Sequence, residues 1–325
     1  MSPSSTPARW DFRHGLFIVA AIACATPWSS PPIALAVGIV LALAGLAAFE
    51  KGAKKLSRVI IQVCVVLLGL RIDLMTLARE AGGGFLFAAA TIVGAFVLGF
   101  GLEKLLRTGK ELTLLVSSGT AICGGSAIAA VGTSIGASSS AMAVATGAIF
   151  ILNAVALYVF PLIGHALHLT DAQFGTWAGV AIHDVSSVVG AASSYHSNAA
   201  AVGSTALDTA NVIKLTRVLW ILPCALFASW VIKRERGGAT HGSAPFPWFI
   251  LLFLLASAVR TFVPRVTGVG EEIKFGARLG FQVALFLIGA GLSRSALRSV
   301  GWRVLTQAVI QWIVIAGVSL MVVMA

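Results

Sequence analysis

Long apolar stretches alternate with short polar or Pro/Gly-rich gaps along almost the whole chain. They recur from Phe12 to the C-terminus, and a helix needs about 20 predominantly apolar residues to cross a bilayer. Counting them predicts about eleven membrane-spanning helices, near residues 14–28, 33–49, 56–71, 84–102, 112–134, 141–165, 174–195, 199–232, 246–263, 278–292 and 302–324. The span at 199–232 is long enough to be tilted, bent or split in two. The pattern predicts an all-α polytopic membrane protein.

Composition agrees with this pattern. Hydrophobic residues make up 58% of the 325 residues and charged residues only 11%, whereas soluble domains carry roughly a quarter charged residues. The net charge of +11 would suggest an acidic partner in a soluble protein. Here most Lys and Arg residues lie in the gaps between apolar stretches, so we read them as topology signals and expect no nucleic-acid binding.

The basic residues predict an orientation. With an odd number of spans, fifteen of the 23 Lys and Arg residues fall on the side of the N-terminus, six fall on the other side, and two, Lys214 and Arg217, lie within a span. Because cytoplasmic loops carry the excess of basic residues, we expect a bacterial inner-membrane protein with a cytoplasmic N-terminus and a periplasmic C-terminus.

Sequence spacing suggests two related halves. Gln62-Val63 with its following Gly69 recurs as Gln282-Val283 with Gly289 at the same spacing. Copies in opposite orientation are typical of the inverted repeats of secondary transporters, and chance similarity between apolar helices is the alternative explanation. We expect a single integral membrane domain with an extra N-terminal helix (1–30), a first repeat (31–170) and a second repeat (171–325) with a linker at 233–245, as a 5+5 inverted repeat.

Three segments carry polar residues within apolar surroundings. The first, at 117–128, contains Gly119, Gly124 and Gly125 and predicts a helix that unwinds inside the bilayer. The free amides of such a break suit an anionic ligand. Close helix packing by small residues is the alternative.

The second segment, at 181–194, places Asp184, Ser187, Ala191 and Ser194 on one helical face. A carboxylate at this depth is expected to face the bundle interior with a cationic or protonated partner. His183 points elsewhere, as a proton relay or as a hydrogen-bonded core histidine.

The third segment, at 204–220, places ionisable and amide side chains at intervals of three. Lys214 or Arg217 could pair with Asp184 or Asp208, or supply the positive charge of an anion site. Alternatively, the span ends near residue 215 and these side chains extend to the membrane surface. Intramembrane ionisable residues usually have a functional role, which favours the first reading.

Metal and cofactor chemistry is not indicated. The four cysteines each lie inside an apolar segment without CxxC spacing, and no phosphate-binding motif is present. We therefore expect neither a metal site nor a cofactor.

Several of these segments resemble the YeiH-like family of sulfate exporters. The shared motifs are GTAICGGSAIAA at 119–130, HDVSSVVGAAS at 183–193 and KLTR at 214–217, and LLGLRIDL at 67–74 and LIGAGLSRSAL at 287–297 extend the resemblance over nearly the whole chain. The resemblance implies a fold similar to sodium/proton antiporters and bile-acid-type symporters, with two crossing discontinuous helices in a core domain beside a panel domain. On that pattern the first break lies at 119–126 and the second near Gly289 to Ser293.

The leading hypothesis is therefore a secondary transporter that exports a small anion, for which the resemblance implies sulfate, a related sulfur oxyanion or a sulfonate. Protons or sodium would be coupling ions, the bilayer is the surrounding partner, and a homodimer is left open. The candidate substrate-binding residues are Thr120, Cys123, Gly124, Gly125, Ser126, Ser187, Asn211, Lys214 and Arg217, and the candidate coupling or gating residues are Asp184, His183 and Asp208.

Two other classes of function compete with this hypothesis. In a cation/proton antiporter, Asp184 and Asp208 would bind the ion in turn with protons, and Lys214 would be a counter-ion. An intramembrane enzyme would need a nucleophile and a base, for which Ser126 and His183 are the candidates. We expect a transporter and not an enzyme.

Overall fold

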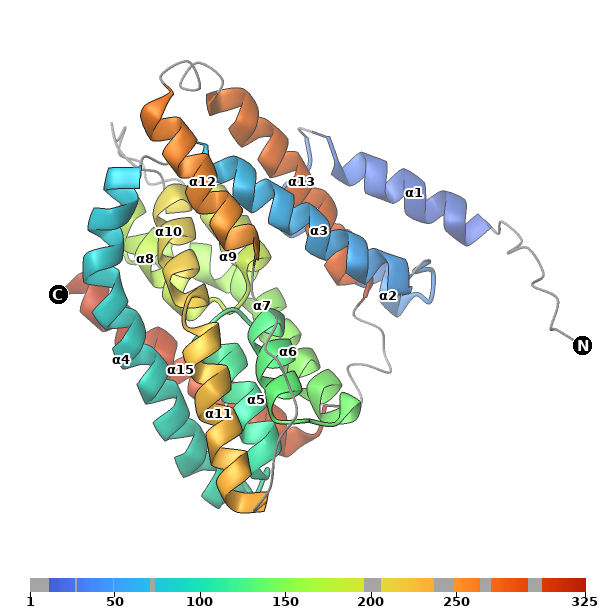
Figure 1. Cartoon of the computed structure of the whole chain (residues 1–325). Helices are drawn as coiled ribbons and strands as arrows, with labels where there is room; N and C mark the ends of the chain where they lie inside the picture. Colours follow the sequence, from blue (N-terminus) through green and yellow to red (C-terminus); the bar gives the residue numbers. More distant parts are fainter. Residues whose placement is uncertain are drawn as a thin grey trace, which may run out of the picture.

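A computed structural model describes residues 12–26, 28–48, 50–70, 74–195, 206–236, 248–263, 270–291 and 300–325. Within these ranges every regular element is a helix (Figure 1). The helices are α1 (Phe12–Cys24), α2 (Pro31–Leu43), α3 (Glu50–Gly69), α4 (Leu74–Leu106), α5 (Lys110–Ala121), α6 (Gly125–Ser134), α7 (Ser139–Ala166), α8 (Asp171–Ala181), α9 (Val185–Ser194), α10 (Ala206–Val218), α11 (Ile221–Arg236), α12 (Trp248–Phe262), α13 (Gly270–Ala290) and α15 (Trp302–Met324).

Four helical segments of the described chain are long and apolar enough to cross a membrane. They are Leu86–Leu106, Ser140–Ala166, Ala206–Arg234 and Trp302–Met324. Large apolar side chains on these segments lie exposed, among them Leu86, Leu162 and Met321, as expected for a surface that faces lipid tails. The expected helical membrane protein is thus confirmed, whereas the full count of eleven spans stays a prediction.

Helices α5 and α6 form a hairpin, which we call the first hairpin (110–134). A Cβ atom added at Gly132 would lie 3.3 Å from Cδ2 of Leu115, although 17 residues of continuous helix would separate such positions by about 25 Å. The two helices are therefore antiparallel. At the open end of the hairpin, the amide of Ser138 donates a hydrogen bond of 2.9 Å to the Glu111 carboxylate.

Helices α8 and α9 form a second hairpin (171–194). The ring of Phe174, near the start of α8, stacks on the ring of Tyr195, which follows α9, with centroids 3.8 Å apart. The Tyr195 hydroxyl also donates to the carbonyl of Leu169, just before α8. The start of α8 and the end of α9 therefore lie side by side, and the tip of the second hairpin is at 182–184.

These hairpins correct two of the predicted spans. The apolar stretches at 112–134 and 174–195 were expected to cross the membrane, yet each consists of two half-length helices that fold back on one another. The basic residues could not reveal this difference, because the connections at 134–141 and 165–174 contain no Lys or Arg. If both apolar stretches fold back as hairpins, the connections at 134–141 and 165–174 move to the opposite sides of the membrane, and every other connection keeps its predicted side.

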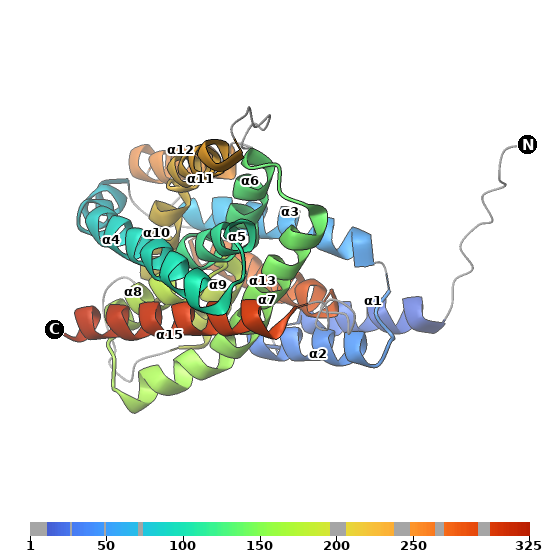
Figure 2. The same ribbon diagram turned by 90° about the horizontal axis from the view of Figure 1, so that it is seen from below.

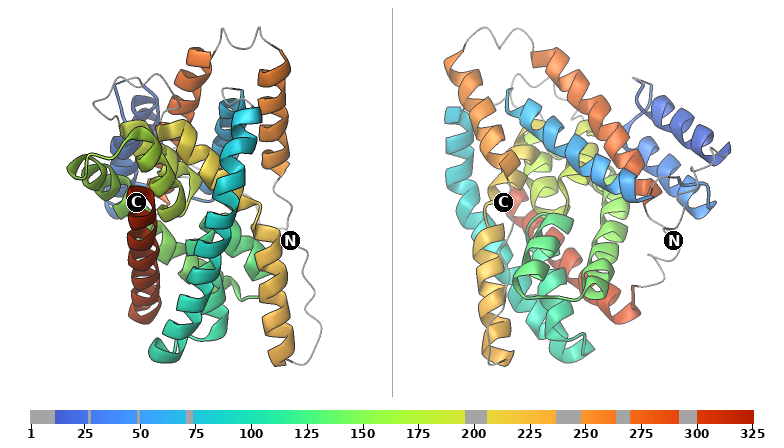
Figure 3. Two further views of the ribbon diagram at one scale, coloured as in Figure 1. Left: turned by 90° about the vertical axis from the view of Figure 1, so that its left-hand side faces the viewer. Right: turned by 45° about the vertical axis from the view of Figure 1, so that its right-hand side comes forward.

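The two hairpins occupy opposite halves of the bundle. In Figure 1, α8 and α9 lie in the upper half and α5 and α6 in the lower half, and the side view in Figure 3 shows α4 extending through both. The predicted long span at 199–232 is split at Leu219–Trp220 into α10 and α11. Helix α10 packs against α8 and α9, whereas α11 packs against α6. One bent span thus contacts both hairpins.

The remaining helices surround this centre. Helix α15 packs along α4 and α8, as the view from below shows (Figure 2), and α13 packs against α2 and α3. Helix α13 continues regularly through Gly289 to Ala290, so this part of the predicted second break is helical, and Leu292 and Ser293 lie outside the described residues.

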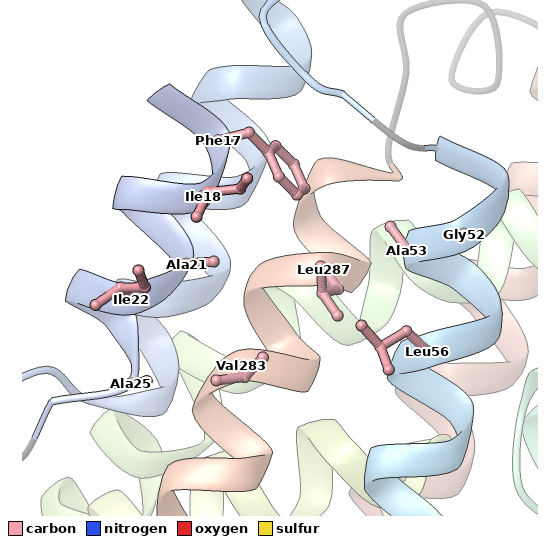
Figure 4. A pocket seen from close by; sticks show the side chains of 10 residues that line it. All are labelled: Phe17, Ile18, Ala21, Ile22, Ala25, Gly52, Ala53, Leu56, Val283 and Leu287. Atoms are coloured by element: carbon pink, nitrogen blue, oxygen red, sulfur yellow. The ribbon is translucent and has the colours of Figure 1, made fainter. Parts of the chain in front are cut away.

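An apolar pocket of about 520 Å³ lies at the periphery, between α1, α3 and α13 (Figure 4). Its lining consists of Phe17, Ile18, Ala21, Ile22, Ala25, Gly52, Ala53, Leu56, Val283 and Leu287. Because none of these side chains is polar, the pocket offers nothing that would recognise a charged solute.

Candidate functional site

The tips of the two hairpins meet. Gly124, at the tip of the first hairpin, has φ +64°, a backbone conformation that residues with a side chain rarely adopt. A Cβ atom added there would lie 3.5 Å from Cβ of Asp184, at the tip of the second hairpin, and 3.3 Å from Cγ2 of Ile149. Four half-helix ends therefore come together at this junction: the C-termini of α5 and α8 and the N-termini of α6 and α9.

Two cations cap the C-terminus of α5. Nζ of Lys214 donates a hydrogen bond of 3.1 Å to the carbonyl of Ile122, and the Arg217 guanidinium donates to the carbonyl of Ala121 and, at 2.7 Å, to Oγ1 of Thr91. Both cationic side chains are fully buried. The last carbonyls of a helix lack intrahelical partners and carry partial negative charge, so these contacts satisfy a helix end inside the bilayer.

Protein side chains also cap both helix ends of the second hairpin. Nε1 of Trp312, on α15, donates a hydrogen bond of 3.1 Å to the carbonyl of Ala181, the last residue of α8. The Asp184 carboxylate is the N-cap of α9 and accepts the amide of Ser187 at 2.6 Å and the hydroxyl of Ser186 at 2.6 Å. A negative charge at this position complements the positive end of the helix.

Asn153, in the middle of α7, joins the two residues at the tip of the second hairpin. Its Nδ2 donates to Oδ2 of Asp184. Its Oδ1 accepts the backbone amide of His183 at 3.1 Å and lies 3.2 Å from Nδ1 of the same histidine. The carboxylate therefore holds Asn153 in one amide orientation, since the reverse orientation would set its oxygen against a carboxylate oxygen.

The fourth helix end, the N-terminus of α6, lacks such a cap. Its N-cap is Gly124, which makes no side-chain capping hydrogen bond. Ser126 is exposed and Gly125 is half-buried, and the buried Cys123 thiol lies within hydrogen-bonding reach of the Ala127 amide and the Ser126 hydroxyl. The first amides of a helix have no intrahelical acceptor. Among the described side chains the thiol of Cys123, a weak acceptor, is the one recorded at the positive end of α6, and no carboxylate or hydroxyl of an N-cap residue satisfies these amides.

Several buried polar atoms around the junction have no partner among the described residues. They are Oγ1 of Thr120, Nε2 of His183, both side-chain polar atoms of Asn211 and Nε of Arg217. Thr120 lies in the last turn of α5, and Asn211 lies one turn before Lys214 on α10. Buried polar groups are normally hydrogen-bonded, so unpaired groups around one junction indicate a place for water or a polar ligand.

The structure thus brings most of the predicted site residues together. Thr120, Cys123, Gly124, Gly125 and Ser126 lie in or next to the first tip, His183, Asp184 and Ser187 in or next to the second, and Asn211, Lys214 and Arg217 on the adjoining α10. Asp208 is the exception, because it lies in the first turn of α10, about 9 Å along the axis from Lys214. It is half-buried and belongs to the outer end of that helix.

One expectation about Asp184 was wrong. It does not share the face of a continuous helix with its neighbours, because it stands at a chain reversal as the N-cap of α9. Its described hydrogen-bond donors are Asn153, Ser186 and Ser187, and Lys214 interacts with its charge electrostatically, with no hydrogen bond recorded between the two among the described residues. The hydrogen bonds follow the helix ends: the carboxylate stabilises an N-terminus, and Lys214 and Arg217 stabilise a C-terminus.

Sequence reasoning missed three residues of the junction: Thr91, Asn153 and Trp312. Thr91 accepts a hydrogen bond from Arg217, and Trp312 donates one to the last carbonyl of α8. The sequence around these two residues does not predict either contact. Asn153 had a signal, because it is a buried amide in the apolar segment 140–166. A lone amide at such depth needs a partner from another helix.

Among the described residues, no three His, Cys, Asp or Glu side chains are grouped as the ligands of a metal ion would be.

Fold and junction together define a multi-spanning helical membrane protein whose centre is built from two helical hairpins that meet tip to tip. A model of the protein family described as "Conserved hypothetical protein 698" matches residues 16–308. The chain belongs to this family, whose curated relatives carry the name UPF0324 membrane protein.

The relatives match along nearly their full length. A UPF0324 membrane protein of Bacteroides thetaiotaomicron is 43% identical over 89% of this chain and 84% of the relative. One of Geobacter sulfurreducens is 40% identical over 95% and 96%, and one of Photobacterium profundum is 36% identical over 98% and 96%. No solved structure matches the chain. The relatives' names state a membrane location and no activity, so function must be argued from the junction.

Proposed function

We propose that the protein is a secondary active transporter that carries a small anion, such as sulfate, a related sulfur oxyanion or a sulfonate, out of the cell across the bacterial inner membrane. The supporting observation is the difference between the four helix ends at the junction. Three are capped by charged or indole side chains, whereas at the positive end of α6 the N-cap is a glycine and the described side chain within reach of the amides is the Cys123 thiol, a weak acceptor. Anions bind favourably at such an end.

The charge balance at the junction supports the same proposal. Lys214 and Arg217 are fully buried, and their hydrogen bonds within the described part of the chain go to neutral oxygens. Asp184 is the single described carboxylate at the tips. Buried charges are stable only when they are paired or well solvated by hydrogen bonds. An anion between the tip of the first hairpin and α10 would balance the excess positive charge, and the unpaired Thr120 and Asn211 would supply further hydrogen bonds.

The hairpins also provide a basis for alternating access. They occupy opposite halves of the bundle and meet in its middle (Figure 1). The expected inverted repeat, with a cytoplasmic N-terminus and a periplasmic C-terminus, rests on the sequence spacing and on the placement of the basic residues. Movement of one hairpin relative to the other would open the junction to one side at a time. Protons or sodium would supply the driving force.

A cation/proton antiporter is the second candidate, because Asp184 is a half-buried carboxylate at the centre of the bundle. In that mechanism Asp184 and Asp208 would bind the cation. Two observations argue against it: both oxygens of Asp184 already accept protein hydrogen bonds, and Asp208 lies at the outer end of α10.

Substituting Ser126 separates the two mechanisms. Ser126→Asp places a carboxylate in the first turn of α6, where it complements the helix end and competes with an anionic substrate. Ser126→Asn changes size equally without the charge. In proteoliposomes, we expect Ser126→Asn to retain radiolabelled sulfate flux and Ser126→Asp to lose most of it, while both remain folded by thermal melting. Equal sulfate flux in the two variants would contradict the proposed anion site. Cation flux in the Ser126→Asp variant that is absent from the Ser126→Asn variant would favour the antiporter.

A further inference from the structure

His183 is held in a defined tautomer by its neighbours. Oδ1 of Asn153 can only accept hydrogen bonds, and it accepts the backbone amide of His183 while lying 3.2 Å from the imidazole Nδ1. Nδ1 therefore carries the hydrogen, and Asn153 cannot turn over because its Nδ2 donates to Asp184. The remaining ring nitrogen, Nε2, is the only atom of this side chain that can gain a proton.

Nε2 of His183 is buried without a partner. The residue is fully buried, and Nε2 has no hydrogen bond among the described residues. With Nδ1 protonated, an unpartnered Nε2 in a neutral ring leaves only a lone pair unsatisfied, whereas a charged imidazolium would leave a buried cation and an unpaired N–H. Without an anion beside it, His183 is therefore more stable with a neutral ring.

The neighbouring charges make the proton depend on an anion. Lys214 and Arg217 act electrostatically on His183 from α10. Trp312 approaches it from α15 with its ring centroid at 6.3 Å and contributes no charge. Asp184, the next residue, directs its carboxylate oxygens to Asn153, Ser186 and Ser187. A third positive charge at this point needs a new negative charge close by, which is what a bound anion supplies.

We propose that His183 takes up a proton at Nε2 when the anion binds to the junction and releases it when the anion leaves. The proton comes from the surrounding water and makes Nε2 a donor toward the anion. Anion and proton binding are then thermodynamically linked, because each makes binding of the other more favourable. The inference rests on the proposed function and adds to it the identity of the coupling ion and of the residue that carries it.

The linkage has a defined sign. Because the proton is bound only together with the anion, the affinity for sulfate should rise as the pH falls, by up to about tenfold per pH unit for one linked proton. Glutamine at position 183 keeps an amide nitrogen near the place of Nε2 but cannot gain a proton at neutral pH. His183→Gln should therefore bind sulfate with an affinity that depends little on pH.

Isothermal titration calorimetry tests this with the purified protein in detergent. Sulfate is titrated in two buffers that differ in ionisation enthalpy, so the difference in heat gives the number of protons taken up. We expect net proton uptake with the wild-type protein and with the control His168→Gln, whose histidine is exposed, and none with His183→Gln. Each variant is first compared with wild type by thermal melting.

The outcomes distinguish the two proposals. Sulfate binding with undiminished proton uptake in His183→Gln overturns the role of His183 and leaves the anion transporter intact. Sulfate binding without proton uptake in the wild-type protein overturns the linkage itself. If sulfate, sulfite and taurine all fail to bind the folded wild-type protein, the proposed substrate class is overturned, and the linkage with it.

Discussion

Gly124 lies directly against Asp184, so that a methyl group on Gly124 would come within 3.5 Å of the Asp184 Cβ atom. This contact lies between the tips of the two hairpins, which reach the centre from opposite halves of the bundle. It depends on a residue without a side chain at φ +64°. The closeness of the two tips is thus set by the backbone itself, and it can be tested by small substitutions.

Gly124→Ala should destabilise the protein and abolish transport. The added methyl group meets strained backbone as well as Ile149 and Asp184, and we expect a loss of about 1–3 kcal/mol in stability. Gly125→Ala is the matched control, because its Cβ would be no closer than 3.7 Å to any neighbour. The melting temperatures of the Gly124→Ala and Gly125→Ala variants are compared in detergent. Equal melting temperatures would contradict the close contact between Gly124 and Asp184.

Arg217→Met should lower stability more than Arg217→Lys. The methionine removes the donors to the Ala121 carbonyl and to Thr91, and each buried group left without a partner costs about 1–3 kcal/mol. Lysine keeps the positive charge and can donate to one of these two oxygens, but its single ammonium group cannot reach both as the guanidinium does. Thermal melting gives the order of the variants, with Lys104→Met as the exposed control. An Arg217→Met protein as stable as wild type would show that the cation does not cap α5.

Asn153→Asp should create a protein that works only at low pH. When protonated, the new carboxyl group can donate to Asp184 as the amide does, and its other oxygen can still accept from His183. As the pH rises the proton is lost, and two carboxylates then face each other in a buried site, which is unfavourable. Transport in proteoliposomes should therefore fall with increasing pH more steeply than in wild type, and a profile identical to wild type would be inconsistent with the bridge.

Asp208→Asn should retain most transport, whereas Asp184→Asn should lose it. Asp208 lies in the first turn of α10, away from the hairpin tips, so its charge contributes about 0.3–1 kcal/mol to the helix terminus. Asp184 is the cap on which the second tip is built. Radiolabelled sulfate flux per folded protein compares the two, and a larger effect from Asp208 would revive the cation antiporter.

The hairpins predict a membrane topology that differs from eleven crossings. Single cysteines at Lys104 and Ser140 should react with an impermeant maleimide from the same side of the membrane, and one at Ala166 from the opposite side. The four natural cysteines are buried and can be replaced first. If each apolar stretch crossed once, Lys104 and Ala166 would share a side and Ser140 would be on the other. The labelling pattern therefore decides between the two arrangements.

Composition and residue type carried much of this picture. The glycines at 119, 124 and 125 and the ionisable residues at 184, 214 and 217 identified the centre, because such residues inside apolar segments need a structural reason. Hydropathy cannot distinguish one crossing from two half-helices of equal total length, since both bury the same number of apolar residues. The direction of the chain after the tip depends on long-range contacts such as Phe174 with Tyr195. The partners of each charge were equally inaccessible, because helix ends attract side chains from distant segments.

The bend at Leu219–Trp220 has a mechanical consequence. Helix α10 packs against the second hairpin and α11 against the first, so one bent span contacts both hairpins. If this span tilted, its contacts with one hairpin would loosen while its contacts with the other would tighten. In the proposed transporter, the continuity of this stretch of chain would oppose simultaneous opening of the junction to both sides of the membrane, which would otherwise dissipate the ion gradient.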